Sequence, residues 1–107
     1  MIAHVILFKP KAGLSDTERA AVLDGLRAAA RGIPSIKKLR VGQRVKHGLP
    51  GYEQAMREDF EFAVIVEVDD LDGLKAYLAH PLHTAIGAHF TQSSSAALAY
   101  DYELQDL

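Results

Sequence analysis

Residues 60–68 constrain the fold of this chain most strongly, because their apolar side chains alternate along the segment. One side carries Phe60, Phe62, Val64, Val66 and Val68, and the other carries Glu61, Ala63, Ile65 and Glu67. A repeat of two residues is typical of a β-strand that buries one face. We therefore predict a strand here, with its more apolar side in the core.

Further elements are predicted on both sides of this strand. Strands are expected over residues 2–8, 36–46 and 96–104, and helices from Ser15 to about Arg31, after Asp69 or Asp70, and from Pro81. Ser15 and Glu18 fit a capping box, which marks the start of a helix. The order strand, helix, strand, strand, helix pair, strand is typical of the split βαβ pattern. This is an α+β, ferredoxin-like fold, in which a four-stranded antiparallel sheet carries its helices on one face.

The length of 107 residues predicts a single domain over residues 1–107, with helices on one sheet face and the other face open. Ala63 and Ile65 would be partly bare on the open face. Burying such a face gains roughly 25 cal/mol per Å². The sequence therefore predicts a homodimer that pairs sheet to sheet.

Charge and cysteine content exclude several classes of function. The net charge is -2, with 49% hydrophobic and 24% charged residues, so neither nucleic acid nor a membrane is expected as a partner. The absence of cysteine excludes disulfides, thiol nucleophiles and Cys-ligated zinc. The apolar run 2–8 is too short for a signal peptide, which favours a cytoplasmic location.

Two polar segments allow more than one interpretation. Basic residues predict a solvated face on the strand 36–46, although the same charges would attract an anionic substrate; they are Lys37, Lys38, Arg40, Arg44 and Lys46. Residues 47–58 are rich in glycine and charge, and are long for a connection between strands. This length favours a mobile or functional loop.

The segment 77–83 places one phenol and two imidazoles beside a helix break. Pro81 disfavours helical geometry at His80 and can itself begin a new helix. Tyr77 and His83 are then on different helices, which allows both side chains to face one cavity. Such groups suit proton chemistry near neutral pH, with His83 as a general base and Tyr77 as a donor to a developing oxyanion.

Each of these residues also has a structural interpretation. His83 can be an imidazole at the start of a helix whose nitrogens form hydrogen bonds with the backbone. Tyr77 can be a ring at the edge of the core with its hydroxyl in water. His4 is on the same strand side as Ile6, so it either lines a pocket or finds a buried hydrogen bond. His80 is expected to cap the free carbonyls at the end of the preceding helix.

An apolar ligand pocket is predicted around the candidate pair. Its expected walls are His4, Ile6, Phe62, Ile86 and Phe90, although such apolar stripes are also typical of a core. A metal site at His80, His83 and His89 is disfavoured, because Pro81 interrupts the spacing and no cysteine or neighbouring carboxylate completes the ligand set. We expect no metal at these histidines and no organic cofactor, and a hard cation bound by carboxylates at the surface or the dimer interface stays an open alternative.

The opening residues 1–9, the Tyr-x-x-His-Pro-x-His block at 77–83 and the order of elements resemble the Dabb family of stress-responsive dimeric α/β barrel proteins. The resemblance implies homodimers whose two sheets form a shared barrel, with a ligand pocket in each subunit between sheet and helices. Some plant members are polyketide cyclases that run an aldol condensation without a cofactor. Their catalytic tyrosine and histidine correspond to Tyr77 and His83.

The chain also departs from those cyclases. They carry a further pocket histidine on the third strand, where this chain has Phe62, and their loop is shorter than residues 47–59. The leading hypothesis is a homodimer that binds an apolar molecule with a carbonyl group and acts as a cofactor-free lyase or cyclase. The alternatives are a non-catalytic, stress-responsive ligand-binding dimer and a haem-binding or cofactor-free monooxygenase.

Overall fold

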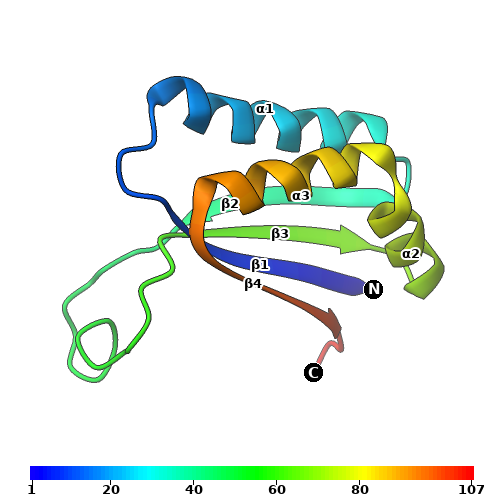
Figure 1. Cartoon of the computed structure of the whole chain (residues 1–107). Coiled ribbons are helices and arrows are strands. Elements are labelled where there is room, and N and C mark those ends of the chain that lie inside the picture. The colour runs from blue at the N-terminus through cyan, green and yellow to red at the C-terminus, as the bar shows by residue number, and fades with distance from the viewer.

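The computed structural model describes residues 1–107 as one four-stranded antiparallel sheet and three helices (Figure 1). In chain order the elements are β1 (Ile2–Pro10), α1 (Asp16–Gly32), β2 (Ile36–Gln43), β3 (Phe62–Val68), α2 (Leu71–Ala79), α3 (Pro81–Ser93) and β4 (Ser94–Glu103). The strand order across the sheet is β2-β3-β1-β4, so β4 and β2 form the two edges. This confirms the predicted α+β, ferredoxin-like fold.

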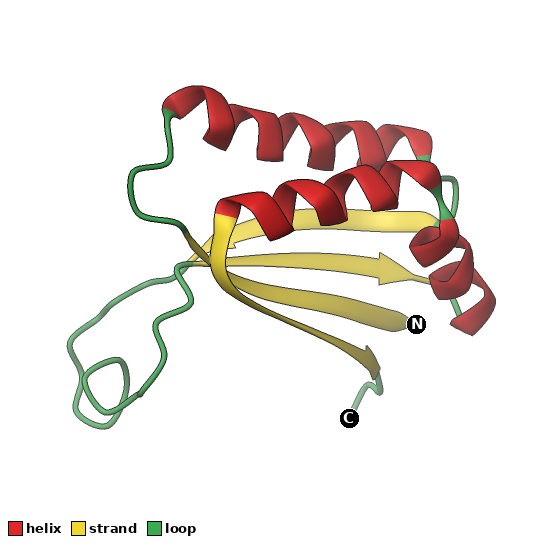
Figure 2. Ribbon diagram, viewed as in Figure 1, coloured by secondary structure: helices red, strands yellow, loops and turns green.

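The three helices lie on one face of the sheet, with α1 and α3 side by side and α2 at one end (Figure 2). Ser15 caps α1 as predicted: its hydroxyl accepts a hydrogen bond from the Glu18 backbone N–H at 3.1 Å. Asp70 caps α2 by accepting from the Gly73 N–H at 2.8 Å. No helix is both long and apolar enough to cross a lipid bilayer.

The core fills the space between the helices and the sheet. Val64, Val66 and Val68 of β3 are fully buried, as the alternation of the sequence predicts. The ring of Phe8 on β1 stacks on Phe62 at 5.4 Å between centroids. Burial of this strand face holds the helix layer in place, and with it the side chains at the start of α3.

Several strand ends differ from the prediction. The central strand begins at Phe62 instead of Phe60, and β2 ends at Gln43 instead of Lys46. Arg44 and Lys46 instead contact Asp59 across the loop, at 2.8 and 2.6 Å. The strands β1 and β4 each extend two residues beyond the predicted junction, where Pro10 pairs with Ser94 at a register shift.

The segment 44–61 projects from the body as a long loop (Figure 1). Ion pairs tie its base down, including Lys9 with Glu58 at 2.5 Å. Of the basic residues in the predicted strand 36–46, Arg40 pairs with Glu67 at 3.4 Å and Lys37 with Asp69 at 3.3 Å. Neighbouring carboxylates therefore neutralise much of the positive charge of this segment, which supports its interpretation as a solvated surface.

The sheet face opposite the helices is uncovered within one chain and is largely apolar over β1, β3 and β4, while Arg40 and Glu67 form an ion pair toward its β2 edge. The strand register places Val5, Leu7, Ala63, Ile65, Leu98, Tyr100 and Tyr102 on this face. Leu98 is 41% exposed, and Tyr100 and Tyr102 are each 53% exposed. A contiguous apolar face of this kind marks an interaction surface.

Candidate functional site

Three rings from three elements meet between the sheet and the helices. His4 is on β1, Tyr77 on α2 and His83 on α3. The ring centroid of Tyr77 is 4.7 Å from that of His83 and 5.3 Å from that of His4, while the two imidazoles are 6.3 Å apart. The structure thus brings the predicted pair Tyr77 and His83 together, and adds His4 to them.

The break at Pro81 produces this arrangement. The helix α2 ends at Ala79, and His80 adopts an extended backbone before Pro81 begins α3. The imidazole of His80 accepts a hydrogen bond at Nδ1 from the Leu82 N–H, at 3.1 Å. His80 therefore caps the start of α3, which corrects the prediction that it caps the carbonyls of the preceding helix. Its extended backbone points its side chain forward along the chain, where the free N–H groups of α3 lie.

His4 is buried and forms a close pair with a carboxylate. Its Nδ1 lies 2.5 Å from Oδ1 of Asp101, and the two residues are direct partners across β1 and β4. An ionised carboxylate only accepts hydrogen bonds, so Nδ1 of His4 carries the hydrogen of this pair. Asp101 was not among the predicted site residues, although the repeat of two places it on the same side of the last strand as Ala99.

The hydroxyl of Tyr77 is the one conspicuous polar atom without a partner in this site. The residue is fully buried, and its hydroxyl makes no hydrogen bond. Burial, aided by the negative charge of Asp101, raises the pKa of Tyr77 to about 12. The phenol therefore keeps its proton throughout the physiological range and is available as a donor.

His83 is half-buried and electrostatically tuned toward its neutral form. Burial lowers the pKa of His83, and the nearby imidazole of His4 lowers it further, while the backbone of Leu78 acts in the opposite direction. A lowered pKa leaves the imidazole unprotonated at pH 7. A neutral imidazole beside a protonated phenol combines a base with a hydrogen-bond donor.

A cavity of about 300 Å³ opens beside these rings, between α3 and the strands β1 and β4. Its lining residues are His4, Ile6, Leu78, His83, Ile86, Gly87, Phe90, Ala97, Leu98 and Ala99. The two imidazoles are the polar side chains in an otherwise apolar wall. Tyr77 does not line the cavity, although its ring centroid is 5.3 Å from that of His4 and 4.7 Å from that of His83. The expectation that Tyr77 and His83 both face one cavity is therefore met by His83 alone, because the ring of Tyr77 is fully buried. This volume and lining are typical of a small-molecule site.

Of the predicted pocket residues, His4, Ile6, Ile86 and Phe90 line this cavity, and Phe62 does not. Phe62 pairs with Phe8 near one end of the strands, whereas His4 pairs with Val66 toward the other. The side chains of Phe62 and His4 both point toward the helices, so the alternation of the sequence did not reveal that they lie far apart along the strands. No group of three or more histidine, cysteine or acidic side chains is arranged to hold a metal ion.

The comparisons with known proteins agree with this architecture. The sequence model of the Stress Responsive A/B Barrel Domain, Dabb, matches residues 2–104. A dimeric ferredoxin-like protein of unknown function from Thermobifida fusca is similar in structure, with a TM-score of 0.74 and 26% identity over 96% of this chain and 90% of that one. No curated protein sequence matches significantly.

Two further solved structures share the fold at low sequence identity. Hydroxynitrile lyase from Passiflora edulis has a TM-score of 0.83 and 11% identity, and the match covers 99% of this chain and 94% of the lyase. SnoaB, a cofactor-independent oxygenase from Streptomyces nogalater, has a TM-score of 0.71 and 13% identity, with 99% and 94% covered. At these identities the likeness establishes the common fold.

Proposed function

This chain belongs to the stress-responsive A/B barrel family, Dabb, and on that premise we propose that it is a homodimeric, cofactor-free enzyme acting on an apolar molecule with a carbonyl group. His83 is the general base and Tyr77 the hydrogen-bond donor. His4 and Asp101 position the two. The apolar walls formed by Ile6, Ile86 and Phe90 hold the body of the substrate.

The unpartnered hydroxyl of Tyr77 is the observation that carries this proposal. A buried hydroxyl without a hydrogen bond costs about 1–3 kcal/mol. A phenylalanine at this position would keep the apolar contacts and avoid that cost. A ligand oxygen that accepts from the hydroxyl would offset the cost only in the complex, as a group devoted to binding or catalysis requires. The hydroxyl does not reach the cavity in this conformation, so the proposal requires the half-buried ring of His83 to move aside when the substrate binds.

The proposed reaction begins with proton transfer from carbon. The neutral imidazole of His83 removes a proton from the carbon next to the substrate carbonyl, and the electron pair of that C–H bond moves onto the carbonyl oxygen as an enolate. Tyr77 donates its hydrogen bond to this oxygen. In an aldol step the enolate carbon then attacks a second carbonyl carbon, and the new alkoxide takes the proton back from the His83 imidazolium.

The activities of two structural neighbours support a reaction of this general kind. The Streptomyces protein is a cofactor-independent oxygenase and the Passiflora protein is a hydroxynitrile lyase. A base next to a hydrogen-bond donor also suits cleavage of a hydroxynitrile: the base removes the hydroxyl proton, the carbonyl forms as the bond to the nitrile carbon breaks, and the departing cyanide takes up the proton. Measuring the proton transfer alone therefore tests the proposal, even while the natural substrate is unidentified.

Exchange of the α-protons of methyl heptyl ketone in D₂O, followed by proton NMR, tests the function. We expect the protein to accelerate exchange above the buffer rate. Ketone binding without accelerated exchange would contradict the enzyme and support the non-catalytic ligand-binding dimer. A Soret band on addition of haem, lost when His4 or His83 is changed to alanine, would support the haem-binding alternative instead.

The pH dependence of this exchange follows from the two perturbed groups. The base must be unprotonated, so kcat/KM is expected to rise with pH through the lowered pKa of His83 and to reach a plateau by neutral pH. The donor must stay protonated, and the pKa of about 12 for Tyr77 keeps the plateau flat to high pH. An acid limb centred well above pH 6.5, or a fall in rate between pH 7 and 9, would contradict these roles.

The homodimer is proposed to form through the open sheet face. Tyr100→Lys puts a charge on this face, and we expect it to shift the protein from about twice the chain mass of 11.7 kDa to the monomer mass in light scattering after gel filtration. Leu71→Lys is the matched control, because Leu71 is similarly exposed, at 54%, but begins α2 on the helix side. A dimer that persists in Tyr100→Lys and dissociates in Leu71→Lys would place the interface elsewhere.

A further inference from the structure

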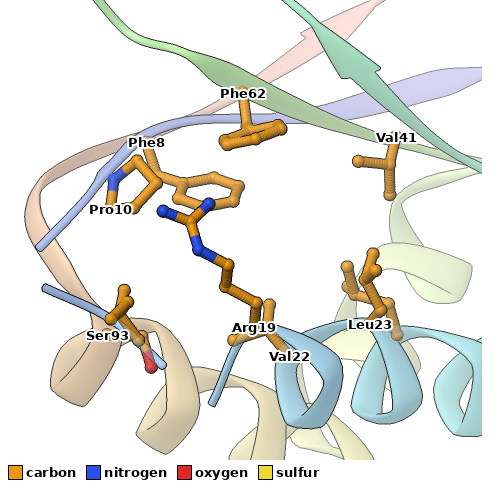
Figure 3. A pocket seen from close by; sticks show the side chains of 10 residues that line it. Phe8, Pro10, Arg19, Val22, Leu23, Val41, Phe62 and Ser93 are labelled. Carbon is orange, nitrogen blue, oxygen red and sulfur yellow. The ribbon is translucent and has the colours of Figure 1, made fainter. Parts of the chain in front are cut away.

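A second cavity, of about 190 Å³, lies under the first half of α1 (Figure 3). Apolar side chains from α1 and from three strands form most of its wall, among them Phe8, Val22, Leu26, Val41 and Phe62. Val41 is 42% exposed, so part of this apolar wall is accessible from solvent. The function proposed above makes no use of this space.

An aromatic pair separates this cavity from the site near His83. The rings of Phe8 and Phe90 meet edge to face, with their centroids 4.8 Å apart. Phe8 lines the second cavity and Phe90 lines the first. The walls of the two cavities therefore meet at this aromatic pair.

Arg19 is the only charged residue that lines the second cavity. It belongs to the same helical face as Val22, Leu23 and Leu26, at spacings of three, four and seven residues. Figure 3 shows its side chain extending from α1 toward Phe8 and Pro10. Helix geometry therefore places the positively charged side chain of Arg19 beside the apolar side chains of the cavity wall.

The guanidinium of Arg19 forms no ion pair or hydrogen bond within the chain. Asp16 precedes it by three residues on α1, yet the two side chains do not pair. By contrast, Arg27 on the same helix pairs with Asp24 at 3.1 Å. A guanidinium offers several donors in a planar fork, which matches the two oxygens of a carboxylate.

We propose that this cavity binds an apolar molecule carrying one carboxylate, such as a medium-chain fatty acid. The hydrocarbon chain occupies the space between Val22, Val41 and Phe62, and the carboxylate accepts hydrogen bonds from Arg19 at the rim. Burial of the chain provides most of the affinity, while the charge pair selects an acid over an alcohol of equal length.

Calorimetric titration with decanoate and with decanol tests this site. Decanoate is expected to bind the unmodified protein at least about tenfold more tightly than decanol does. Arg19→Gln should remove this preference by weakening decanoate alone, and Arg19→Lys should restore part of it. Arg27→Gln is the matched control and should leave both affinities unchanged.

Two further variants locate the ligand. Leu23→Trp at the rim should fill the cavity and weaken both ligands, whereas His83→Ala should alter neither affinity. Failure of decanoate to bind, an unchanged preference in Arg19→Gln, or loss of decanoate binding in His83→Ala would overturn the second site. None of these outcomes depends on ketone exchange, so failure here is distinguishable from failure of the proposed enzyme.

Discussion

His83→Ala is expected to lower the rate of α-proton exchange in methyl heptyl ketone by about 10²–10⁴-fold, because it removes the general base. The imidazole is half-buried at the start of α3, where burial and His4 lower its pKa and keep it neutral. The measurement is the exchange rate by NMR at saturating ketone and neutral pH.

His89→Ala is the matched control for the loss of an imidazole from α3. His89 is on the same helix but does not line the cavity beside Tyr77. We expect this variant to retain nearly the full exchange rate, and both variants to keep the circular dichroism spectrum of the unmodified protein. Equal loss in both variants, or full activity in His83→Ala, would show that His83 is not the base.

Most of the fold could be predicted from the sequence, because local and long-range signals agree. Ser15 and Glu18 form the predicted capping box, and the valines of residues 62–68 are buried as their alternation predicts. The ends of the strands were predicted less accurately. Arg44 and Lys46 continue the alternation of β2 but bind Asp59 in the loop, a contact between distant residues that periodicity does not encode.

The pair at the centre of the site was also predictable, since it depends on one local break. Pro81 separates two helices, and the structure brings Tyr77 and His83 to 4.7 Å between ring centroids. Asp101 was not predictable in the same way. Its role depends on the pairing of His4 with Asp101 across β1 and β4, and strand register between distant segments cannot be read from alternation.

The same limit explains the position of Phe62. Its parity on β3 correctly places it toward the helices, but its distance along the strand separates it from His4. It stacks on Phe8 and lines other hollows. The alternation of the sequence therefore indicated on which face of the sheet these side chains lie, and the structure was needed to determine how far apart they are along that face.

Tyr77→Phe is expected to change activity and stability in opposite directions. Loss of the hydroxyl removes the donor to the enolate oxygen, which should lower the exchange rate by about 10²–10³-fold. Within the folded chain the same hydroxyl is buried and has no hydrogen-bond partner. Its removal should therefore leave the free energy of unfolding unchanged or raise it, by up to about 1–3 kcal/mol.

Tyr52→Phe is the control for loss of a phenol hydroxyl, because Tyr52 is in the exposed loop, 54% accessible. Neither its exchange rate nor its free energy of unfolding should change appreciably. The comparison is made at one pH between 7 and 9, where Tyr77 remains protonated. Differences between the two variants then report on the position of the hydroxyl.

The most direct test of the account is to measure ketone exchange and urea unfolding on the same preparation of Tyr77→Phe. We predict a protein at least as stable as the unmodified one, with exchange slowed by about 10²-fold or more. A variant that is less stable yet exchanges ketone protons at the original rate would contradict the account. In that case the hydroxyl of Tyr77 would serve the fold, and the cavity beside His83 would have no catalytic donor.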